Sequence, residues 1–494
     1  MDRIAHWTLR RRALALALAV TTGLSLATPH ASAQPAVPAA RLPGTPFLAD
    51  SVVGLKVGGW SLSTPSQGII DSADRSSGGR NLLTDTASVV MLQEYRMTSA
   101  TTGTRRLDPI VMPFVASASG NRALTMASNS GSEGALRRSA DGQYLTLAGY
   151  NQSQPTALIT ASAPTSATDP ATGQGAKFAP SVVNRTLGRV DALGNVNTAT
   201  ALTDAYSGDN LRSAVSSNGN QFWTSGNISG SSQNATGGVR YATLGAATSV
   251  QVEGSASPGL TTSNINKMDI YNGQLYASVR QAANNGIWQI GTGTPTTAVN
   301  GTRILDYNAL VSTATGRSVA SGTSMNPNTM FQGPYDFFFA SDSTLYIADS
   351  ILGISKFTRN AQSIWQYGYT FARTGGVQND GTNGQPKQAG GATGLAGRVL
   401  TGGQVALYAT GGFSGQPVNG VLDSFGGNFL YALIDAGADS DITILDVAAA
   451  NEHFKGVALA PLDATVIPLP PAMALMLGGL ALLGAIGRRR RHHA

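Results

Sequence analysis

The chain has 494 residues, with 33 Lys and Arg against 27 Asp and Glu, and no cysteine. Disulfide bonds are therefore excluded, and stability must come from an ordinary core or from a closed architecture. Eight arginines and one aspartate lie in residues 1–33 and 464–494, so the body between them carries 25 basic and 26 acidic residues. A body so close to neutrality gives no support for nucleic-acid binding, and we exclude that class of function.

Residues 1–33 have the three parts of a secretory signal peptide. A basic start that includes Arg10, Arg11 and Arg12 precedes an apolar stretch, and Ala31 and Ala33 provide the small side chains of a cleavage site. We expect signal peptidase to cut after Ala33. The general secretory and twin-arginine routes of export both stay open.

The body, residues 34–463, is rich in Gly, Ser and Thr and shows no long helical periodicity. It instead repeats a hairpin in which an alternating apolar strand, a tight turn and a second strand follow one another. In chain order the first strands are 135–140, 211–216, 267–271, 335–340 and 397–400. The second strands are 144–148, 222–223, 275–277, 345–347 and 405–408. Third strands that begin with glycine follow three of these hairpins, at 238–241, 286–290 and 353–357.

Units of three or four strands that recur roughly every 55 to 75 residues predict the blades of a β-propeller. Residues 453–460 form a sixth inner strand that has no following chain to complete its blade, whereas 52–57 and 89–95 are strands without an inner strand. Pairing them closes the ring and removes exposed sheet edges. We therefore predict an all-β propeller of six blades, with seven blades as the alternative. A parallel β-helix is the second choice of architecture, although its repeats would be shorter and more regular.

Three stretches of the body, 132–136, 139–150 and 454–461, resemble a group of exported bacterial propeller-like proteins. No activity is established for that group. The resemblance therefore supports a fold and a location outside the cell, and no chemistry.

Few side chains of the body suit catalysis by a nucleophile or a transition metal. His453 is its only histidine, and the chain has no Gly-x-Ser-x-Gly motif. A serine-based triad and a zinc, haem or copper site are therefore not expected, and we predict no bound cofactor other than a calcium ion. Because His453 stands at the start of a strand, we expect it on the surface.

Two further groups of residues could take part in binding. Asp435, Asp439 and Asp441 could offer three oxygen ligands to calcium, although a solvated hairpin turn explains the same pattern. The tryptophans at 223, 288 and 365 could stack on sugars, but their alternating placement within strands favours packing between blades.

The last segment, residues 464–494, has the layout of a sorting tail. An extended proline-rich stretch precedes an apolar segment, 472–487, that we expect to form a transmembrane helix. Four arginines follow it and should lie in the cytoplasm by the positive-inside rule. The residues that we assign to processing are Pro468, Leu469, Pro470, Arg488, Arg489, Arg490 and Arg491.

This tail resembles the PEP-CTERM sorting signals of Gram-negative bacteria, in their Val-Pro-Leu-Pro-Ala variant. Residues 468–470 take the place of the Pro-Glu-Pro core. The resemblance implies recognition by an exosortase-type protease, transient insertion in the inner membrane, and release or transfer to the cell surface. A plain single-pass anchor is the alternative.

Taken together, these features predict an exported protein of the cell surface or extracellular matrix, with a non-enzymatic propeller that binds exopolysaccharide or another surface protein. The alternative is an extracellular hydrolase or lyase that acts on carbohydrate through carboxylates on its loops.

Overall fold

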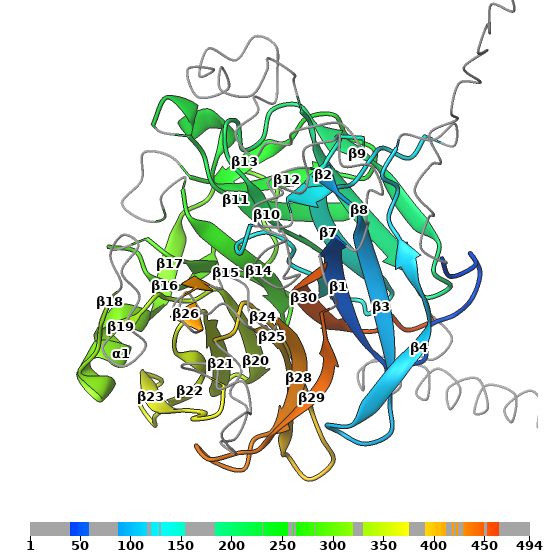
Figure 1. The fold of residues 1–494 in the computed structure, drawn as a ribbon. Coiled ribbons are helices and arrows are strands. Elements are labelled where there is room, and N and C mark those ends of the chain that lie inside the picture. The colour runs from blue at the N-terminus through cyan, green and yellow to red at the C-terminus, as the bar shows by residue number, and fades with distance from the viewer. Residues whose placement is uncertain are drawn as a thin grey trace, which may run out of the picture. The chain divides into compact units, whose positions relative to one another are not determined.

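The computed structural model describes residues 40–58, 87–115, 120–127, 130–153, 183–229, 231–254, 260, 263–281, 283–319, 330–374, 391–411, 417–418, 421–422, 428–448 and 452–463. These residues contain six four-stranded antiparallel sheets set around a central axis, which is the architecture of a six-bladed β-propeller (Figure 1). The prediction of an all-β propeller with six blades is confirmed.

We name the blades A to F in the order of their inner strands around the ring, and each is given from its inner to its outer strand. Blade A consists of β30 (Glu452–Leu459), β1 (Val52–Gly58), β3 (Val90–Met97) and β4 (Gly103–Val111). Blade B consists of β6 (Arg137–Arg138), β7 (Tyr144–Tyr150), β8 (Arg185–Asp191) and β9 (Val196–Leu202). Blade C consists of β10 (Leu211–Ser216), β11 (Gln221–Gly226), β12 (Val239–Thr243) and β13 (Val250–Glu253).

The other three blades have the same layout. Blade D consists of β14 (Ile265–Tyr271), β15 (Gln274–Val279), β16 (Gly286–Ile290) and β17 (Gly301–Asp306). Blade E consists of β20 (Asp336–Ser341), β21 (Thr344–Asp349), β22 (Gly353–Arg359) and β23 (Trp365–Thr370). Blade F consists of β24 (Gly394–Val399), β25 (Val405–Gly411), β28 (Phe429–Ile434) and β29 (Ile442–Val447).

The remaining elements are short. The two-stranded sheets pair β2 (Ala87–Ser88) with β5 (Met126–Ala127), β18 (Ser318–Val319) with β19 (Met330–Phe331), and β26 (Pro417–Val418) with β27 (Val421–Leu422). The helical elements are η4 (Ser231–Thr236) and α1 (Tyr307–Thr315). Helix α1 begins where the side chain of Asp306 accepts a hydrogen bond from the backbone N–H of Ala309, at 3.0 Å, and ends at Gly316, whose φ of 68° suits a residue without Cβ.

The ring closes through strands from opposite ends of the body, as the sequence predicts. Strand β1 pairs with β30 on one side and with β3 on the other, so Val53 lies opposite both Ala458 and Glu94. The ion pair between Lys56 and Glu452, at 2.9 Å, joins the same two strands. His453 lies within this closure, opposite Val57, with only 2% of its surface exposed. The expectation that His453 is a surface residue is therefore wrong, because closure of the ring covers the start of its strand.

The apolar core lies within and between the blades. Trp223, Trp288 and Trp365 are 0%, 6% and 4% exposed, respectively. The indole N–H of Trp223 donates a hydrogen bond to the carbonyl oxygen of Pro295 at 2.6 Å, and its ring packs on Tyr241. The prediction that these rings pack in the core is confirmed, so they are not available to stack on a ligand.

Both predicted targeting segments lie outside the described residues. These are the signal peptide at 1–33 and the tail at 464–494, with its transmembrane helix at 472–487. Within the part of the chain that the structure describes, none of the helices has the length and apolar character needed to cross a membrane.

Substitution of Gly456 tests the closure of the ring. A Cβ at this position of β30 would overlap the carbonyl oxygen of Gly134 and lie 2.8 Å from the amide nitrogen of Leu136, just before β6. We expect Gly456→Ala to lower the free energy of unfolding by about 2 kcal/mol or more, because two backbones must separate. Urea denaturation measures this loss.

Gly301→Ala is the matched control on outer strand β17, where a Cβ meets no atom closer than 3.5 Å. We expect it to change the unfolding free energy by less than about 0.5 kcal/mol. Equal effects of the two substitutions would show that the approach of β30 to β6 does not limit packing.

Candidate functional site

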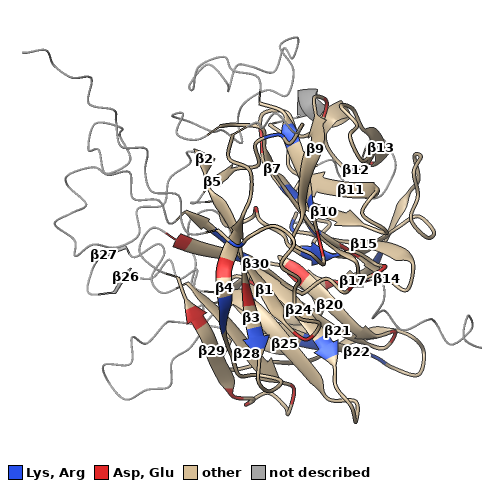
Figure 2. Cartoon of the chain, turned by 90° about the vertical axis from the view of Figure 1, so that its right-hand side faces the viewer, with Lys and Arg blue, Asp and Glu red and all other residues tan. Residues whose placement is uncertain are grey.

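Charged side chains from the inner strands fill the axis of the propeller. Every blade presents its inner strand to the axis, and in Figure 2 blue and red segments lie close together between the labels β10, β15 and β30. A charge in such a place is costly unless a partner compensates it. The partners of each charge therefore decide what the axis can do.

Arg137 is the centre of this network. From blade B its guanidinium makes two hydrogen bonds to the carboxylate of Asp336 in blade E, one of them at 3.2 Å. Its Nε also donates to the carbonyl oxygen of Met268 in blade D at 2.8 Å, and its Nη1 donates to that of Leu395 in blade F at 3.3 Å. Asp336 accepts further hydrogen bonds from the backbone N–H groups of Phe337 and Leu395, at 2.7 and 2.8 Å. One arginine thus links four of the six blades.

A second layer of buried charge lies beside this pair. Lys267 of blade D is fully buried and donates to the carbonyl oxygens of Ser132 and Glu133, each at 3.2 Å. Lys455 of blade A donates to the carbonyl oxygen of Ser130. Burial lowers the pKa of Lys267 to about 7 and that of Lys455 to about 8.

Glu133 is the acid that acts on Lys455, whereas Asp336 acts on Lys267. It is 1% exposed, and its carboxylate accepts hydrogen bonds from the hydroxyl of Tyr150 at 2.8 Å and from the backbone N–H of Ala127 at 3.2 Å. Burial raises the pKa of Glu133, while Lys455 opposes that shift. The segment before β6 therefore supplies backbone carbonyls to the lysines of blades A and D, and an acid to Lys455 of blade A.

Blade C contributes Arg212, whose hydrogen-bond partners are asparagine side chains and not an acid. Its guanidinium donates to the side-chain oxygens of Asn266, Asn210 and Asn264 at 2.7, 2.9 and 3.2 Å. Burial lowers the pKa of Arg212 to about 10. Arg212, Asn210 and Asn266 are at most 8% exposed, so this part of the axis is a packed polar core.

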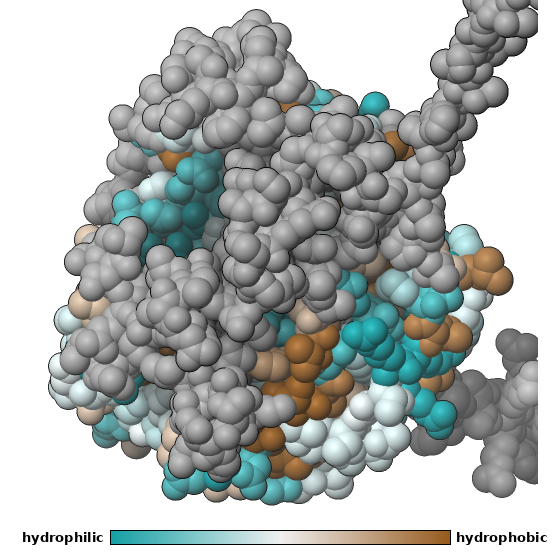
Figure 3. Space-filling model, viewed as in Figure 1, coloured by the Kyte–Doolittle hydropathy of each residue, from teal (hydrophilic) through white to brown (hydrophobic). Residues whose placement is uncertain are grey.

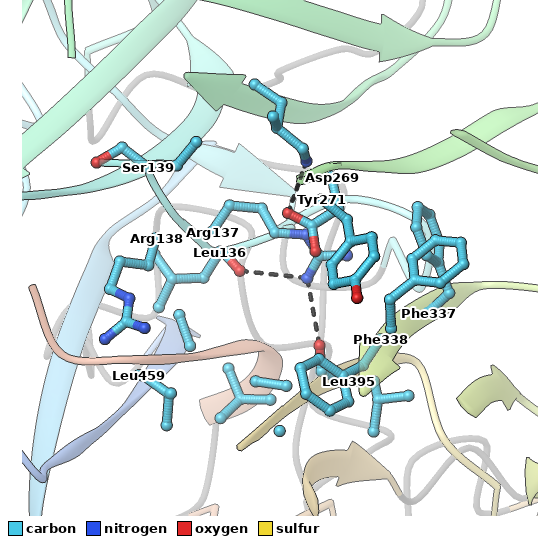
Figure 4. A pocket seen from close by; sticks show the side chains of 17 residues that line it. Leu136, Arg137, Arg138, Ser139, Asp269, Tyr271, Phe337, Phe338, Leu395 and Leu459 are labelled. Atoms are coloured by element: carbon cyan, nitrogen blue, oxygen red, sulfur yellow. Dashed lines mark hydrogen bonds between the residues drawn. The ribbon is translucent and has the colours of Figure 1, made fainter. Parts of the chain in front are cut away.

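A cavity of about 220 Å³ lies against this core, toward the ends of the inner strands (Figure 4). Its lining comes from residues 136–140 of blade B, 269–271 of blade D, 337–339 of blade E, 395–397 of blade F and 457–459 of blade A. Figure 4 shows Arg138 on one side of the pocket and Tyr271, Phe337 and Phe338 on the other. The pocket therefore has a cationic side and an aromatic side.

Three charged residues line this pocket. Arg137 is bound by Asp336, as described above, and Asp269 lies beside it in Figure 4. Burial raises the pKa of the Asp269 carboxyl to about 6, against the lowering effect of Arg137. Arg138 makes one hydrogen bond, a long one of 3.4 Å to the carbonyl oxygen of Ala460, and no ion pair among the described residues. Burial and the nearby Arg398 hold the pKa of Arg138 below its ordinary value, while Asp269 raises it.

The structure does not gather the predicted calcium ligands into a site. Asp435 accepts hydrogen bonds from the hydroxyls of Tyr346 and Tyr369 and from the ammonium of Lys356, and Asp441 lies 3.3 Å from Arg373. Within the described ranges, no group of three or more His, Cys, Asp or Glu side chains could hold a metal ion. The candidate processing residues, from Ala31 and Ala33 to the tail at 468–491, lie outside the described residues.

The residues of the pocket are not among the sites predicted above, although the sequence holds a signal for them. Charged residues interrupt otherwise apolar inner strands at 137–138, 267, 269, 336 and 455. A charge in a strand that the fold buries must meet a partner, so such positions mark the axis of a propeller. The partners themselves could not be assigned, because they come from blades far apart in the chain.

The part of the described surface that Figure 3 shows points to no single ligand class. On the face seen in Figure 3, described residues are hydrophilic near β11 and hydrophobic over β28. The pocket is therefore the more specific feature.

Comparisons with known proteins add no function. No protein-family model and no curated protein sequence matches this chain. Among solved structures it is similar to an ancestral GH74 enzyme (10% identity, 73% of this chain, 41% of that chain, TM-score 0.32). It is also similar to a hypothetical selenium-binding protein from Sulfolobus tokodaii (8% identity, 85% of this chain, 98% of that chain, TM-score 0.37). A third similar structure is a subtype N11 neuraminidase-like protein of A/flat-faced bat/Peru (11% identity, 74% of this chain, 94% of that chain, TM-score 0.30). The chain thus spans less than half of the GH74 enzyme, and likenesses this distant carry no argument about function.

Uncoupling Arg137 from Asp336 tests the polar core. We expect Arg137→Leu and Asp336→Asn each to cost about 3–5 kcal/mol of unfolding free energy, because each leaves a buried group without its partner. The loss of unfolding free energy in the double variant should be about 1–3 kcal/mol smaller than the sum of the two single losses, because neither group is then buried without its partner. Chemical denaturation of the four proteins measures this coupling.

The pair Arg303–Asp306, with side chains 32% and 38% exposed, is the matched control. The same substitutions there, Arg303→Leu and Asp306→Asn, should couple by less than about 1 kcal/mol. Additive losses at 137 and 336 would mean that the pair across the axis does not hold the blades together.

Proposed function

We propose that this chain is an exported protein of the cell surface or extracellular matrix whose propeller binds a carbohydrate without turning it over. The observation that carries the proposal is the pocket at the axis. It combines a cation with little compensation, Arg138, with a carboxyl at Asp269 and an aromatic side that includes Tyr271 and Phe338. Aromatic faces and a few polar groups are what a pocket needs to hold and orient a sugar ring.

The size of the pocket limits the ligand. Sites for drug-sized molecules are roughly 300–1,000 Å³, whereas this cavity is about 220 Å³. A single sugar unit at the end or on a branch of a polysaccharide fits such a site better than a long segment of chain. The packed core below it, with Arg137 bound to Asp336, prevents a polymer from threading the axis.

The composition of the lining favours binding over hydrolysis. Glycosidases of the usual kind place two carboxyl groups on either side of the bond that they cleave. Of the residues that line this pocket, Asp269 alone carries a carboxyl. One acid can accept hydrogen bonds from sugar hydroxyls but does not supply the acid and the base together.

The export part of the proposal depends on the terminal segments. Residues 1–33 have the layout of a signal peptide, and 464–494 resemble a PEP-CTERM tail, so signal peptidase and an exosortase-type protease are the proposed processing partners. The last described residues lie close to the pocket, because the N–H of Leu462 donates to the carbonyl oxygen of Gly142 at 2.8 Å, beside β6. The described chain therefore ends close to the pocket.

A glycan array with product analysis tests the binding part. We expect the full chain, purified in a detergent without a sugar headgroup, to retain particular glycans and to release no shortened product. Ala396→Trp, which places a large ring in the pocket lining, should abolish retention, whereas Leu193→Trp at an exposed turn should not. Release of shortened glycans would overturn the non-enzymatic proposal, and silence across the array would overturn carbohydrate binding.

The intact mass of the mature protein tests the export part. In a Gram-negative producer with an exosortase system, we expect the surface fraction to contain protein that lacks residues 1–33 and the four arginines 488–491. Replacing Pro468 and Pro470 with Ala should retain the arginines, because the extended segment at the membrane edge is lost. Wild-type protein that stays in the inner membrane with residues 488–491 attached would overturn the processing step.

A further inference from the structure

The two arginines of the pocket differ in how they are compensated. Arg137 uses its donors on the carboxylate of Asp336 and on two backbone carbonyls. Arg138 is its neighbour in sequence, yet among the described residues the 3.4 Å contact with the carbonyl oxygen of Ala460 is the only hydrogen bond of its guanidinium. A guanidinium has five N–H donors in a planar fork, which matches the two oxygens of a carboxylate. Arg138 therefore offers an anion a site that Arg137 does not.

The remaining lining restricts which anion fits. Asp269 faces the same cavity, so a doubly charged group such as a phosphate would be repelled more strongly than a singly charged carboxylate. The carboxyl of Asp269 can instead accept hydrogen bonds from hydroxyl groups. Tyr271 and Phe338 lie across the pocket from Arg138, where they stack on Phe339 and Tyr346, and such apolar rings can pack against the C–H groups of a sugar.

We propose that the pocket selects a sugar unit that carries a carboxylate, a hexuronate, and this inference rests on the proposed carbohydrate binding. Arg138 receives the carboxylate in a bidentate pair, Asp269 accepts hydrogen bonds from the hydroxyls, and the aromatic side packs on the ring. The Arg137–Asp336 pair closes the inner end and keeps these groups in place. The ligand would be an acidic polysaccharide presented outside the cell.

The pocket also gives the binding a dependence on pH. The charged groups around Asp269 are Arg137 and Arg138 from blade B and Asp336 from blade E, with Arg398 of blade F close to Arg138. The guanidinium groups of these arginines stay charged and the uronate stays ionised in the range from pH 5 to 7.5. As the pH falls through about 6, Asp269 takes up a proton and stops repelling the ligand carboxylate. Affinity for the uronate should therefore rise as the pH falls.

Calorimetric titration of the full chain, in a detergent without a sugar headgroup, tests the inference with methyl glucuronide and methyl glucoside, which differ only in the carboxylate. We expect the glucuronide to bind about tenfold more tightly or better, as a charge-assisted pair allows. Arg138→Gln should reduce glucuronide affinity to the level of the glucoside and leave the glucoside unchanged. Asp269→Asn should remove the pH dependence of the glucuronide between pH 5 and 7.5.

Arg303→Gln, in the outer strand of blade D, is the matched control and should change neither affinity. Arg138→Lys keeps a positive charge but lacks the planar guanidinium, so it should retain part of the preference for the glucuronide over the glucoside. This variant keeps the inference testable if Arg138→Gln folds poorly. Equal affinities for the two sugars, or an equal loss of both in Arg138→Gln, would overturn the inference and leave carbohydrate binding standing. Tighter binding of glucose 6-phosphate or glucose 6-sulfate would overturn the choice of a carboxylate. If no sugar binds and the array is also silent, the proposed function fails as well.

Discussion

A buried arginine that must be neutralised on the axis is the constraint on which the rest of this propeller depends. Arg137 reaches the carboxylate of Asp336 across the ring and the backbone carbonyls of Met268 and Leu395 on the way. A buried charge that loses its partner costs several kcal/mol, so these four blades tolerate little relative movement. The inner end of the pocket is built from the same contacts, and its shape is therefore set by the stability of the fold.

Closure of the ring satisfies the other requirement of an all-β chain without disulfides. Strand β1 lies between β30 and β3 and pairs with both. The edge of β30, the inner strand of blade A, that faces β1 is therefore hydrogen-bonded. The close approach of Gly456 to Gly134 then brings blade A against blade B. Residues from the two ends of the body thus complete one sheet, which ties the first and last parts of the chain into a single cooperative unit.

The pocket separates two uses of charge that are adjacent in the sequence. Arg137 and Arg138 both line the pocket, but Arg137 pairs with Asp336 across the axis, whereas Arg138 makes no ion pair among the described residues. The first stabilises the ring, and the second is left for a ligand. Lys267, Lys455 and Glu133 are buried beside the pocket, so the described cavity offers a ligand its approach to the axis.

The sequence by itself determined the class of fold and the way in which the ring closes, and it favoured six blades over seven. The hairpins that begin at 135, 211, 267, 335 and 397 all appear as the inner two strands of blades, because alternation of apolar residues and turn chemistry are local properties. It also suggested the packing of Trp223, but it misplaced His453 and pointed to Asp435 as a metal ligand where the structure shows Lys356 and two tyrosines. The pocket and the partners of Arg137, Arg138 and Asp269 were decided only by the tertiary structure. The physical reason is that charge compensation acts through space between blades, and Asp336 lies 199 residues from the arginine that it neutralises.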